Sequence, residues 1–140
     1  LTGAAGAYYI AFRLSVEGNA VGLTTYGTRS IDLIVANPDT EKSIAIQAKT
    51  MKNALVHNRK EGDYYKWRVA KKLPPAHEAF FYTFVGLTDQ TTDTPEVFVV
   101  PSQKLTSLLN DHSGDVWCVI YEKDWPKYQN RWDIIKAALA

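Results

Sequence analysis

The chain has little sulfur and no segment suited to a lipid bilayer. It contains one cysteine and one methionine among 140 residues, so no disulfide can form within it. Cys118 lies in the apolar run VWCVIY, which favours a buried thiol over a nucleophile. No uninterrupted apolar run approaches the roughly 20 residues that cross a membrane, and the first residues lack the pattern of a signal peptide. We therefore expect a cytoplasmic protein with no membrane partner.

The chain also lacks a large excess of positive or negative charge, but its charged residues are unevenly distributed along the sequence. The net charge is only +1, which by itself argues neither for nor against a polyanionic partner. Residues 49–72 carry eight Lys and Arg against two acids, a net of +6, whereas residues 1–48 sum to −1 and residues 73–140 to −4. The positive charge therefore follows directly on the tripeptide Gln47-Ala48-Lys49.

The composition fits a single folded domain over residues 1–140. Hydrophobic residues make up 46% of the chain and charged residues 22%, which suffices for a full core at this length. Neither internal repeats nor a low-complexity tract divides the sequence. We therefore expect one globular unit without a flexible linker.

The spacing of apolar residues predicts an α/β domain that opens as helix, strand, strand, strand. The first helix is expected over residues 4–17, ends before Gly18 and carries the apolar stripe Ala7, Ile10, Ala11, Leu14 and Val16. Strands are expected at residues 20–25, 31–37, 43–50, 78–87 and 96–101, a short strand or buried segment at 116–121, and further helices at 101–110 and 124–140. Residues 51–63 are expected to form a loop, and residues 64–72 fit either helix or strand.

The second and third strands form a predicted hairpin whose register brings polar side chains together. A turn centred on Asp39 and Thr40 makes paired residue numbers sum to about 79, which sets Asp32 opposite Gln47. Alternation places Lys49 on the same side as Gln47. This register also brings the apolar side chains together on the other face of the hairpin. A slip of one residue would mix apolar and polar side chains on each face, so the pattern disfavours it. The apolar residues are Ile31, Leu33, Val35, Ile44, Ile46 and Ala48.

The polar cluster suits metal-assisted hydrolysis of a phosphodiester. Asp32, the Gln47 amide oxygen and the Ala48 carbonyl are oxygen ligands of the kind that Mg²⁺ or Mn²⁺ takes. The Lys49 ammonium would orient the attacking water and offset developing negative charge. A structural interpretation remains open at this point, because Asp32 and Lys49 could instead form a cross-strand ion pair while Gln47 satisfies a strand-edge carbonyl.

The order of these motifs resembles the core of the PD-(D/E)XK nuclease superfamily. The resemblance rests on GTRSIDLIVAN, a turn and SIAIQAKT, and the Q-x-K form is similar to that of Mrr-like restriction enzymes and some homing endonucleases. It implies a restriction-endonuclease-like mixed central β-sheet flanked by helices, and a divalent-metal-dependent endonuclease that hydrolyses DNA. By the same resemblance Asp32 is the metal-binding acid, Gln47 the variant second ligand and Lys49 the catalytic lysine.

The sequence departs from that pattern at the first helix. Related enzymes often carry a glutamate early in this helix, and the corresponding position here is Ala7. Glu17 lies about two and a half turns further on, too far to replace it. The site then offers one formal negative charge, which implies weak Mg²⁺ binding unless a substrate phosphate contributes. Two alternatives follow: a catalytically impaired DNA-binding or regulatory module with the same fold, or an interaction domain without a nucleic-acid role.

The basic segment is the candidate DNA-binding region. Lys and Arg can contact phosphates while an aromatic side chain stacks on a base, although a solvated amphipathic surface would have the same composition. Cutting both strands of a duplex needs two sites, which is compatible with a homodimer, but no segment is identified as its interface. The residues assigned to DNA binding are Arg29, Ser30, Lys52, Asn53, Arg59, Lys60, Trp67, Lys71 and Lys72.

Overall fold

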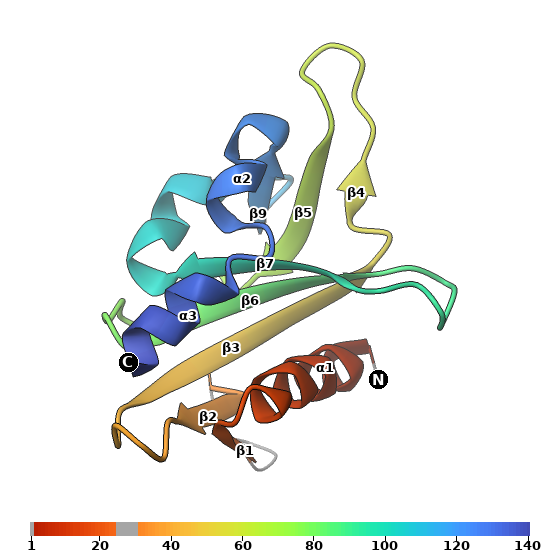
Figure 1. The fold of residues 1–140 in the computed structure, drawn as a ribbon. Helices are drawn as coiled ribbons and strands as arrows, with labels where there is room; N and C mark the ends of the chain where they lie inside the picture. The colour runs from red at the N-terminus through yellow and green to blue at the C-terminus, as the bar shows by residue number, and fades with distance from the viewer. Residues whose placement is uncertain (1, 25–30) are drawn as a thin grey trace.

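Two β-sheets and a few helices form the part of the chain that the structure describes, residues 2–24 and 31–140 of a computed structural model (Figure 1). The larger sheet has five strands in the order β1-β2-β3-β6-β7: Ala20–Leu23, Leu33–Ala36, Ser43–Lys52, Phe80–Leu87 and Glu96–Pro101. The second sheet has four in the order β4-β5-β9-β8: Leu55–Val56, Tyr64–Val69, Asp115–Tyr121 and Leu109–His112. The helices are α1 (Thr2–Val16), η1 (Ser102–Leu108), η2 (Glu122–Asp124), α2 (Trp125–Tyr128) and α3 (Trp132–Leu139).

The larger sheet is mixed, which confirms the fold class expected from the sequence. Strands β1, β2 and β3 pair antiparallel, β3 pairs parallel with β6, and β6 pairs antiparallel with β7. The chain between the parallel strands β3 and β6 supplies β4 and β5 of the second sheet. The α-β-β-β opening is also present as predicted.

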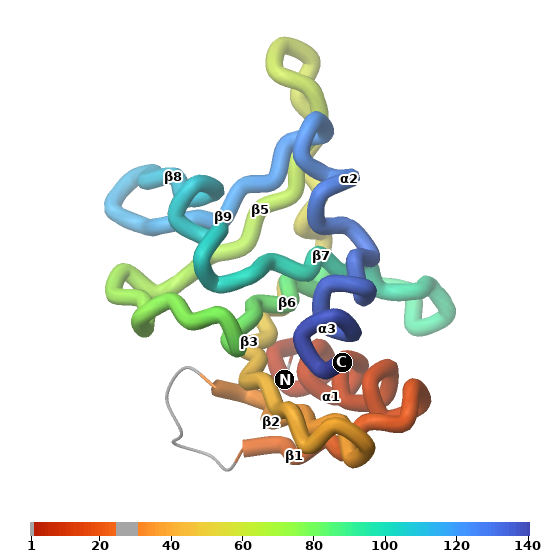
Figure 2. Tube along the Cα trace, turned by 60° about the vertical axis from the view of Figure 1, so that its left-hand side comes forward, coloured from red at the N-terminus to blue at the C-terminus, as the bar shows by residue number. Residues whose placement is uncertain are grey.

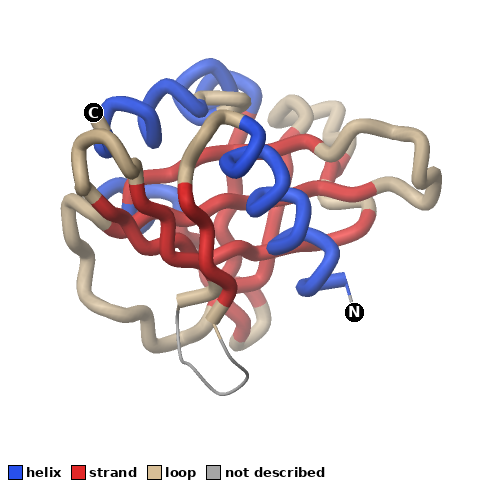
Figure 3. Tube along the Cα trace, turned by 60° about the horizontal axis from the view of Figure 1, so that its bottom comes forward, coloured by secondary structure: helices blue, strands red, loops and turns tan. Residues whose placement is uncertain are grey.

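Each face of the larger sheet is covered by a separate core. On one face, Ile46, Phe81 and Val85 pack with residues of α1 and α3, and Figure 3 shows α1 lying across the strands. On the other face, Phe84 and its neighbours pack against the second sheet, η1 and α2. Burial on that side raises the pKa of the Tyr82 phenol to about 12. The larger sheet is therefore the middle layer of the domain.

Helix α1 follows its predicted position with one error in its apolar stripe. Gly6, Ile10 and Leu14 are its buried residues, whereas Val16 is 71% exposed and does not belong to the core. The helix ends before Gly18, whose φ of 94° suits a residue without a Cβ atom. In the described segments, no helix combines the length and apolar character that a membrane crossing requires.

Two predicted segments are wrong and a third, which the sequence left ambiguous, is resolved by the second sheet. Residues 51–63 are not one loop, since β3 continues through Lys52 and β4 follows. Residues 64–72 contain the strand β5, and the helix expected at 101–110 is the short 3₁₀ segment η1 followed by β8. The pairing of β5 with β9 joins Trp67 to Cys118, about fifty residues away in the chain. Such long-range pairing has no local signal in the sequence.

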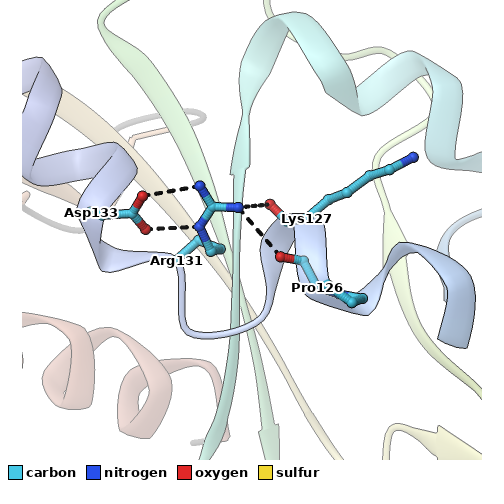
Figure 4. A network of polar contacts seen from close by, with 4 residues as sticks. All are labelled: Pro126, Lys127, Arg131 and Asp133. Carbon is cyan, nitrogen blue, oxygen red and sulfur yellow. Dashed lines mark hydrogen bonds and ion pairs between the residues drawn. The ribbon is translucent and has the colours of Figure 1, made fainter.

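The single helix predicted at 124–140 is also wrong, because α2 and α3 are separated by a turn at Asn130, whose φ is 53°. Figure 4 shows how Arg131 joins the two pieces. Its guanidinium donates to both carboxylate oxygens of Asp133, at 2.9 and 3.0 Å, and to the carbonyls of Pro126 and Lys127, at 3.3 and 3.4 Å. The hydrogen bonds from Arg131 lower the pKa of Asp133 from its ordinary value.

The contact of α1 with β3 yields a test of the packing. A Cβ added to Gly6 would clash with Oγ1 of Thr50, whereas a Cβ on Gly3 would meet nothing within 4 Å. Gly6→Ala should therefore lower the free energy of unfolding by about 1–3 kcal/mol, as overpacked cores do. Gly3→Ala, the matched control in the same helix, should leave it unchanged or raise it by up to about 1 kcal/mol. Urea unfolding measures both, and equal effects would contradict the close approach.

Candidate metal and catalytic site

The hairpin that carries the candidate residues has the predicted register. Strand β2 pairs antiparallel with β3 through Leu33 with Ile46 and Val35 with Ile44, so paired numbers sum to 79. The regular pairing stops at Leu33, and Asp32 lies immediately before it. Beyond Ile46, the strand β3 continues for six more residues without β2 beside it.

A local irregularity sets the position of Asp32. Its N–H donates to the carbonyl of Ile46 at 2.8 Å, although Ile46 is already the partner of Leu33. Two successive residues thus face one residue of β3, which is the arrangement of a β-bulge, and a bulge re-aims a side chain. Asp32 is consequently offset by one residue from the direct pairing with Gln47 that the simple hairpin predicts.

The Asp32 carboxylate lies against the backbone of β3. Its Oδ2 accepts a hydrogen bond from the N–H of Ala48 at 2.8 Å. The N–H and carbonyl of one residue point to the same side of a strand, so the Ala48 carbonyl also faces this edge. The carboxylate and the carbonyl therefore meet at one edge of β3. Among the described residues no ion pair joins Asp32 to Lys49, which removes the purely structural pair considered from the sequence.

Gln47 and Lys49 share one face of the sheet, as alternation predicts. In the parallel ladder Gln47 pairs with Tyr82 and Lys49 with Phe84, both of which belong to the core under the second sheet. Both polar residues are half-buried. Ala7 and Ala48 instead pack against the core on the opposite face, toward α1. An acid at position 7 would thus approach from the helix side and not from the face of Gln47.

A pocket of about 510 Å³ adjoins this edge. Ile31, which precedes Asp32, and Ile34, two residues after it, line the pocket together with Ala45 and with Pro74 and Pro75 from the segment before β6. That segment is therefore close to the start of β2. The lining of the pocket is mainly apolar. The pocket therefore makes the surface beside Asp32 concave but adds little charge to it.

The basic residues fall into separate groups. Lys71 and Lys72 are exposed just after β5 and next to Leu73 and Pro74, on the side of the pocket beside Asp32. Arg59 and Lys60 are exposed in the loop between β4 and β5, the hairpin that projects at the top of Figures 1 and 2. The six residues of β5 separate the two pairs by about 20 Å. The segment is thus not one continuous patch.

The remaining assigned residues have mixed outcomes. Lys52 and Asn53 are exposed at the far end of β3. Arg29 and Ser30 lie outside the described residues. Trp67 is a correction: it is 0% exposed, and its Nε1 donates to the Val85 carbonyl at 2.9 Å, so it cannot stack on a base.

The error at Trp67 follows from strand alternation. In β5, Tyr65, Trp67 and Val69 point into the core, and Lys66 and Arg68 therefore point outward. The composition of residues 49–72 places aromatic and basic side chains on one predicted surface, and that prediction does not assign Lys66 or Arg68 to DNA binding. A strand assignment for residues 64–69 would have separated the two sets.

The donor types of Asp32, Ala48 and Gln47 suit a hard divalent cation. A carboxylate, a backbone carbonyl and a side-chain amide all supply oxygen, which Mg²⁺ and Mn²⁺ prefer. Across residues 2–24 and 31–140 no group of three or more His, Cys, Asp or Glu could hold a metal ion. These donors would therefore form a metal site with a single formal negative charge, as the sequence indicates.

The mixed sheet with α1 packed across it defines a restriction-endonuclease-like fold. The bacterial homing endonuclease I-Ssp6803I is similar with a TM-score of 0.58 and 16% sequence identity, covering 96% of this chain and 90% of its own. Hjc, a Holliday junction resolvase from the archaeal hyperthermophile Archaeoglobus fulgidus, is similar with a TM-score of 0.51 and 12% identity, covering 97% of both chains. No protein-family model and no curated protein sequence matches the chain. At these identities the likeness is one of fold.

Metal affinity tests the donor set. Asp32→Asn should abolish Mn²⁺ binding in calorimetric titration, because it removes the only formal charge, while its amide oxygen can still accept from Ala48 and preserve the fold. Gln47→Glu should tighten binding by adding a second charge. Asp39→Asn, an exposed acid in the β2–β3 turn, is the matched control and should change nothing. Unaltered Mn²⁺ affinity in Asp32→Asn would exclude this site.

Proposed function

We propose that the protein is a divalent-metal-dependent endonuclease that hydrolyses DNA phosphodiester bonds. The observation that carries the proposal is the hydrogen bond from Ala48 to the Asp32 carboxylate, which fixes the single acid at the centre of the Gln47-Ala48-Lys49 tripeptide. An acid held at that point of a strand pair is what the nuclease motif requires. The likeness in fold to a homing endonuclease and a Holliday junction resolvase supports DNA as the substrate class.

Each residue of the edge has a proposed role. Asp32, the Gln47 amide and the Ala48 carbonyl would hold Mg²⁺ or Mn²⁺. When bound, such an ion polarises the phosphate and lowers the pKa of a coordinated water. Lys49 would donate hydrogen bonds to a phosphate oxygen and to the attacking water, which offsets the charge that develops as the P–O bond breaks.

DNA would approach along the edge that carries Lys71 and Lys72. These two exposed cations lie closest in the chain to the pocket beside Asp32, so they are suited to the phosphates that flank the scissile bond. Lys52, Asn53, Arg59 and Lys60 would contact more distant parts of the substrate. Their separation implies an extended contact with the nucleic acid.

A second candidate is a DNA-binding module that does not cleave. The observation that favours it is the single formal charge of the donor set, together with an alanine at position 7 that packs on the opposite face. Such a protein would keep the basic residues and the fold, and would lack metal-dependent nicking. The two candidates differ in the role of Lys49.

Plasmid nicking distinguishes them. Lys49→Ala should lower Mg²⁺- or Mn²⁺-dependent nicking of supercoiled DNA by about a hundredfold or more, since one pre-positioned donor contributes that much to stabilising the transition state. DNA affinity should change by no more than about threefold, the usual share of one cation. Lys136→Ala, which removes an exposed lysine on α3, is the control and should nick normally.

Two outcomes would contradict catalysis by this site. Equal nicking by the wild-type protein and Lys49→Ala would mean a contaminating nuclease. No nicking by the wild-type protein on duplex, single-stranded or branched DNA at any metal concentration would favour the binding module.

The binding edge is tested by salt dependence. Lys71→Ala combined with Lys72→Ala should make the slope of log affinity against log salt shallower by about 2 for a short blunt duplex, because each phosphate contact contributes about 0.9. The charge-matched control combines Lys42→Ala with Lys136→Ala, which are exposed in the β2–β3 turn and on α3. Fluorescence anisotropy between about 50 and 200 mM salt measures the slope. Identical slopes for the two double variants would remove Lys71 and Lys72 from the interface.

A further inference from the structure

The outer face of the second sheet carries aromatic and basic side chains that the cleavage site does not use. In β5 the outward residues are Tyr64, Lys66 and Arg68, and the directly opposed residues in β9 are Tyr121, Val119 and Trp117. We call the five residues Tyr64, Lys66, Arg68, Trp117 and Tyr121 the aromatic face. It lies on the side of the second sheet away from the larger sheet, because Trp67 and Cys118 point into the core between them.

The side chains of the aromatic face contact one another in a fixed order. The rings of Tyr64 and Tyr121 have centroids 5.5 Å apart. Nζ of Lys66 lies 4.6 Å from the centroid of Trp117, and Cζ of Arg68 lies 5.7 Å from the same ring. Tyr64, Trp117 and Tyr121 are each only partly buried, so part of each ring is open to a ligand.

A pocket of about 210 Å³ lies among these residues. Tyr64, Lys66, Trp117 and Tyr121 line it, as does His112. Pockets for drug-sized ligands span roughly 300–1,000 Å³, so this one suits a single planar group. The lining offers ring faces for stacking and a nearby ammonium for a negatively charged or polar substituent.

The charge of this surface argues against duplex DNA as its ligand. Glu61 and Asp111 also line the pocket, and Arg68 is paired with Asp115 at 2.8 Å. The two cations of the aromatic face are therefore offset by acids, and phosphate attraction alone gives little affinity there. Bases in a duplex are stacked on one another and present no ring faces, whereas unpaired bases can stack on aromatic side chains.

A source of phosphate contacts adjoins the tyrosine end of the face. The loop that precedes β5 exposes Arg59 and Lys60, and the next residue, Glu61, already lines the pocket. These cations lie at the other end of β5 from Lys71 and Lys72. A strand whose bases contact the aromatic face would thus have its backbone near Arg59 and Lys60.

We propose that the aromatic face binds unpaired bases of a single-stranded part of the DNA substrate. The inference rests on DNA being the substrate, as proposed above, and narrows it to DNA that contains unpaired nucleotides near the cleavage point. Arg59 and Lys60 hold the backbone of this strand, while Lys71 and Lys72 hold the duplex beside Asp32. One molecule then contacts duplex and single strand at opposite ends of β5.

Binding without metal tests the proposal separately from cleavage. A fluorescein-labelled single strand of about a dozen nucleotides and a blunt duplex are titrated with wild-type protein, Trp117→Leu and Tyr64→Leu in EDTA. Each variant keeps apolar bulk and removes one ring. Each should bind the single strand about tenfold more weakly, the worth of one base–aromatic stack, and the duplex within about twofold of the wild type. Tyr8→Leu, a ring 62% exposed on α1, is the matched control and should bind both as the wild type does.

A crosslinking measurement guards against variants that fold poorly. A single strand with 5-bromodeoxyuridine, irradiated with the wild-type protein, should crosslink to peptides that contain Tyr64, Trp117 or Tyr121. Crosslinks confined to other peptides, or single-strand affinity unchanged in both folded variants, would overturn the inference. An aromatic face that binds a basic peptide and no single strand would overturn it as well. Plasmid nicking that needs Lys49 would stand in each of these cases, so failure here is distinct from failure of the proposed function.

Discussion

The parallel pairing of β3 with β6 is the constraint on which the rest of the structure depends. It joins eight residue pairs, from Ala45 with Phe80 to Lys52 with Leu87. A parallel pair needs a long crossover, and here the crossover passes through β4 and β5, so the second sheet must form on one face of the first. The helices α1 and α3 then cover the other face. Both cores are consequences of this one ladder.

The candidate site lies where β3 has no neighbouring strand on the side away from β6. Strand β2 accompanies β3 only as far as Ile46, and the bulge at Asp32 turns a carboxylate onto the N–H of Ala48. Helix α1 covers one face of β3 beyond this point, and it approaches so closely at Gly6 that an added Cβ would clash with Thr50. The Asp32 carboxylate therefore lies at the strand edge that β2 leaves unpaired, and we propose that a cation and a phosphate share ligands there.

The sequence predicted this hairpin because its information is local. The apolar alternation of residues 31–37 and 43–50 admits one register, and the structure has it. The bulge at Asp32 was not predicted, because the alternation of apolar and polar residues does not reveal an extra residue in one strand. The burial of Trp67 was not predicted for a different reason. Its partner strand β9 lies about fifty residues away, and only the pairing with β9 decides which side of β5 is buried. The break at Asn130 and the Arg131 contacts that span it have no signal in the apolar periodicity.

The central claim is that Asp32 and Ala48 together hold a divalent ion. Anomalous diffraction from crystals grown with Mn²⁺ and a DNA duplex tests it most directly, because the signal locates the ion without assuming its ligands. The account predicts a manganese peak at roughly 2.0–2.3 Å from the Asp32 carboxylate and the Ala48 carbonyl, with the Gln47 amide oxygen close by. A peak bound elsewhere on the protein, with none between Asp32 and Ala48, would contradict it.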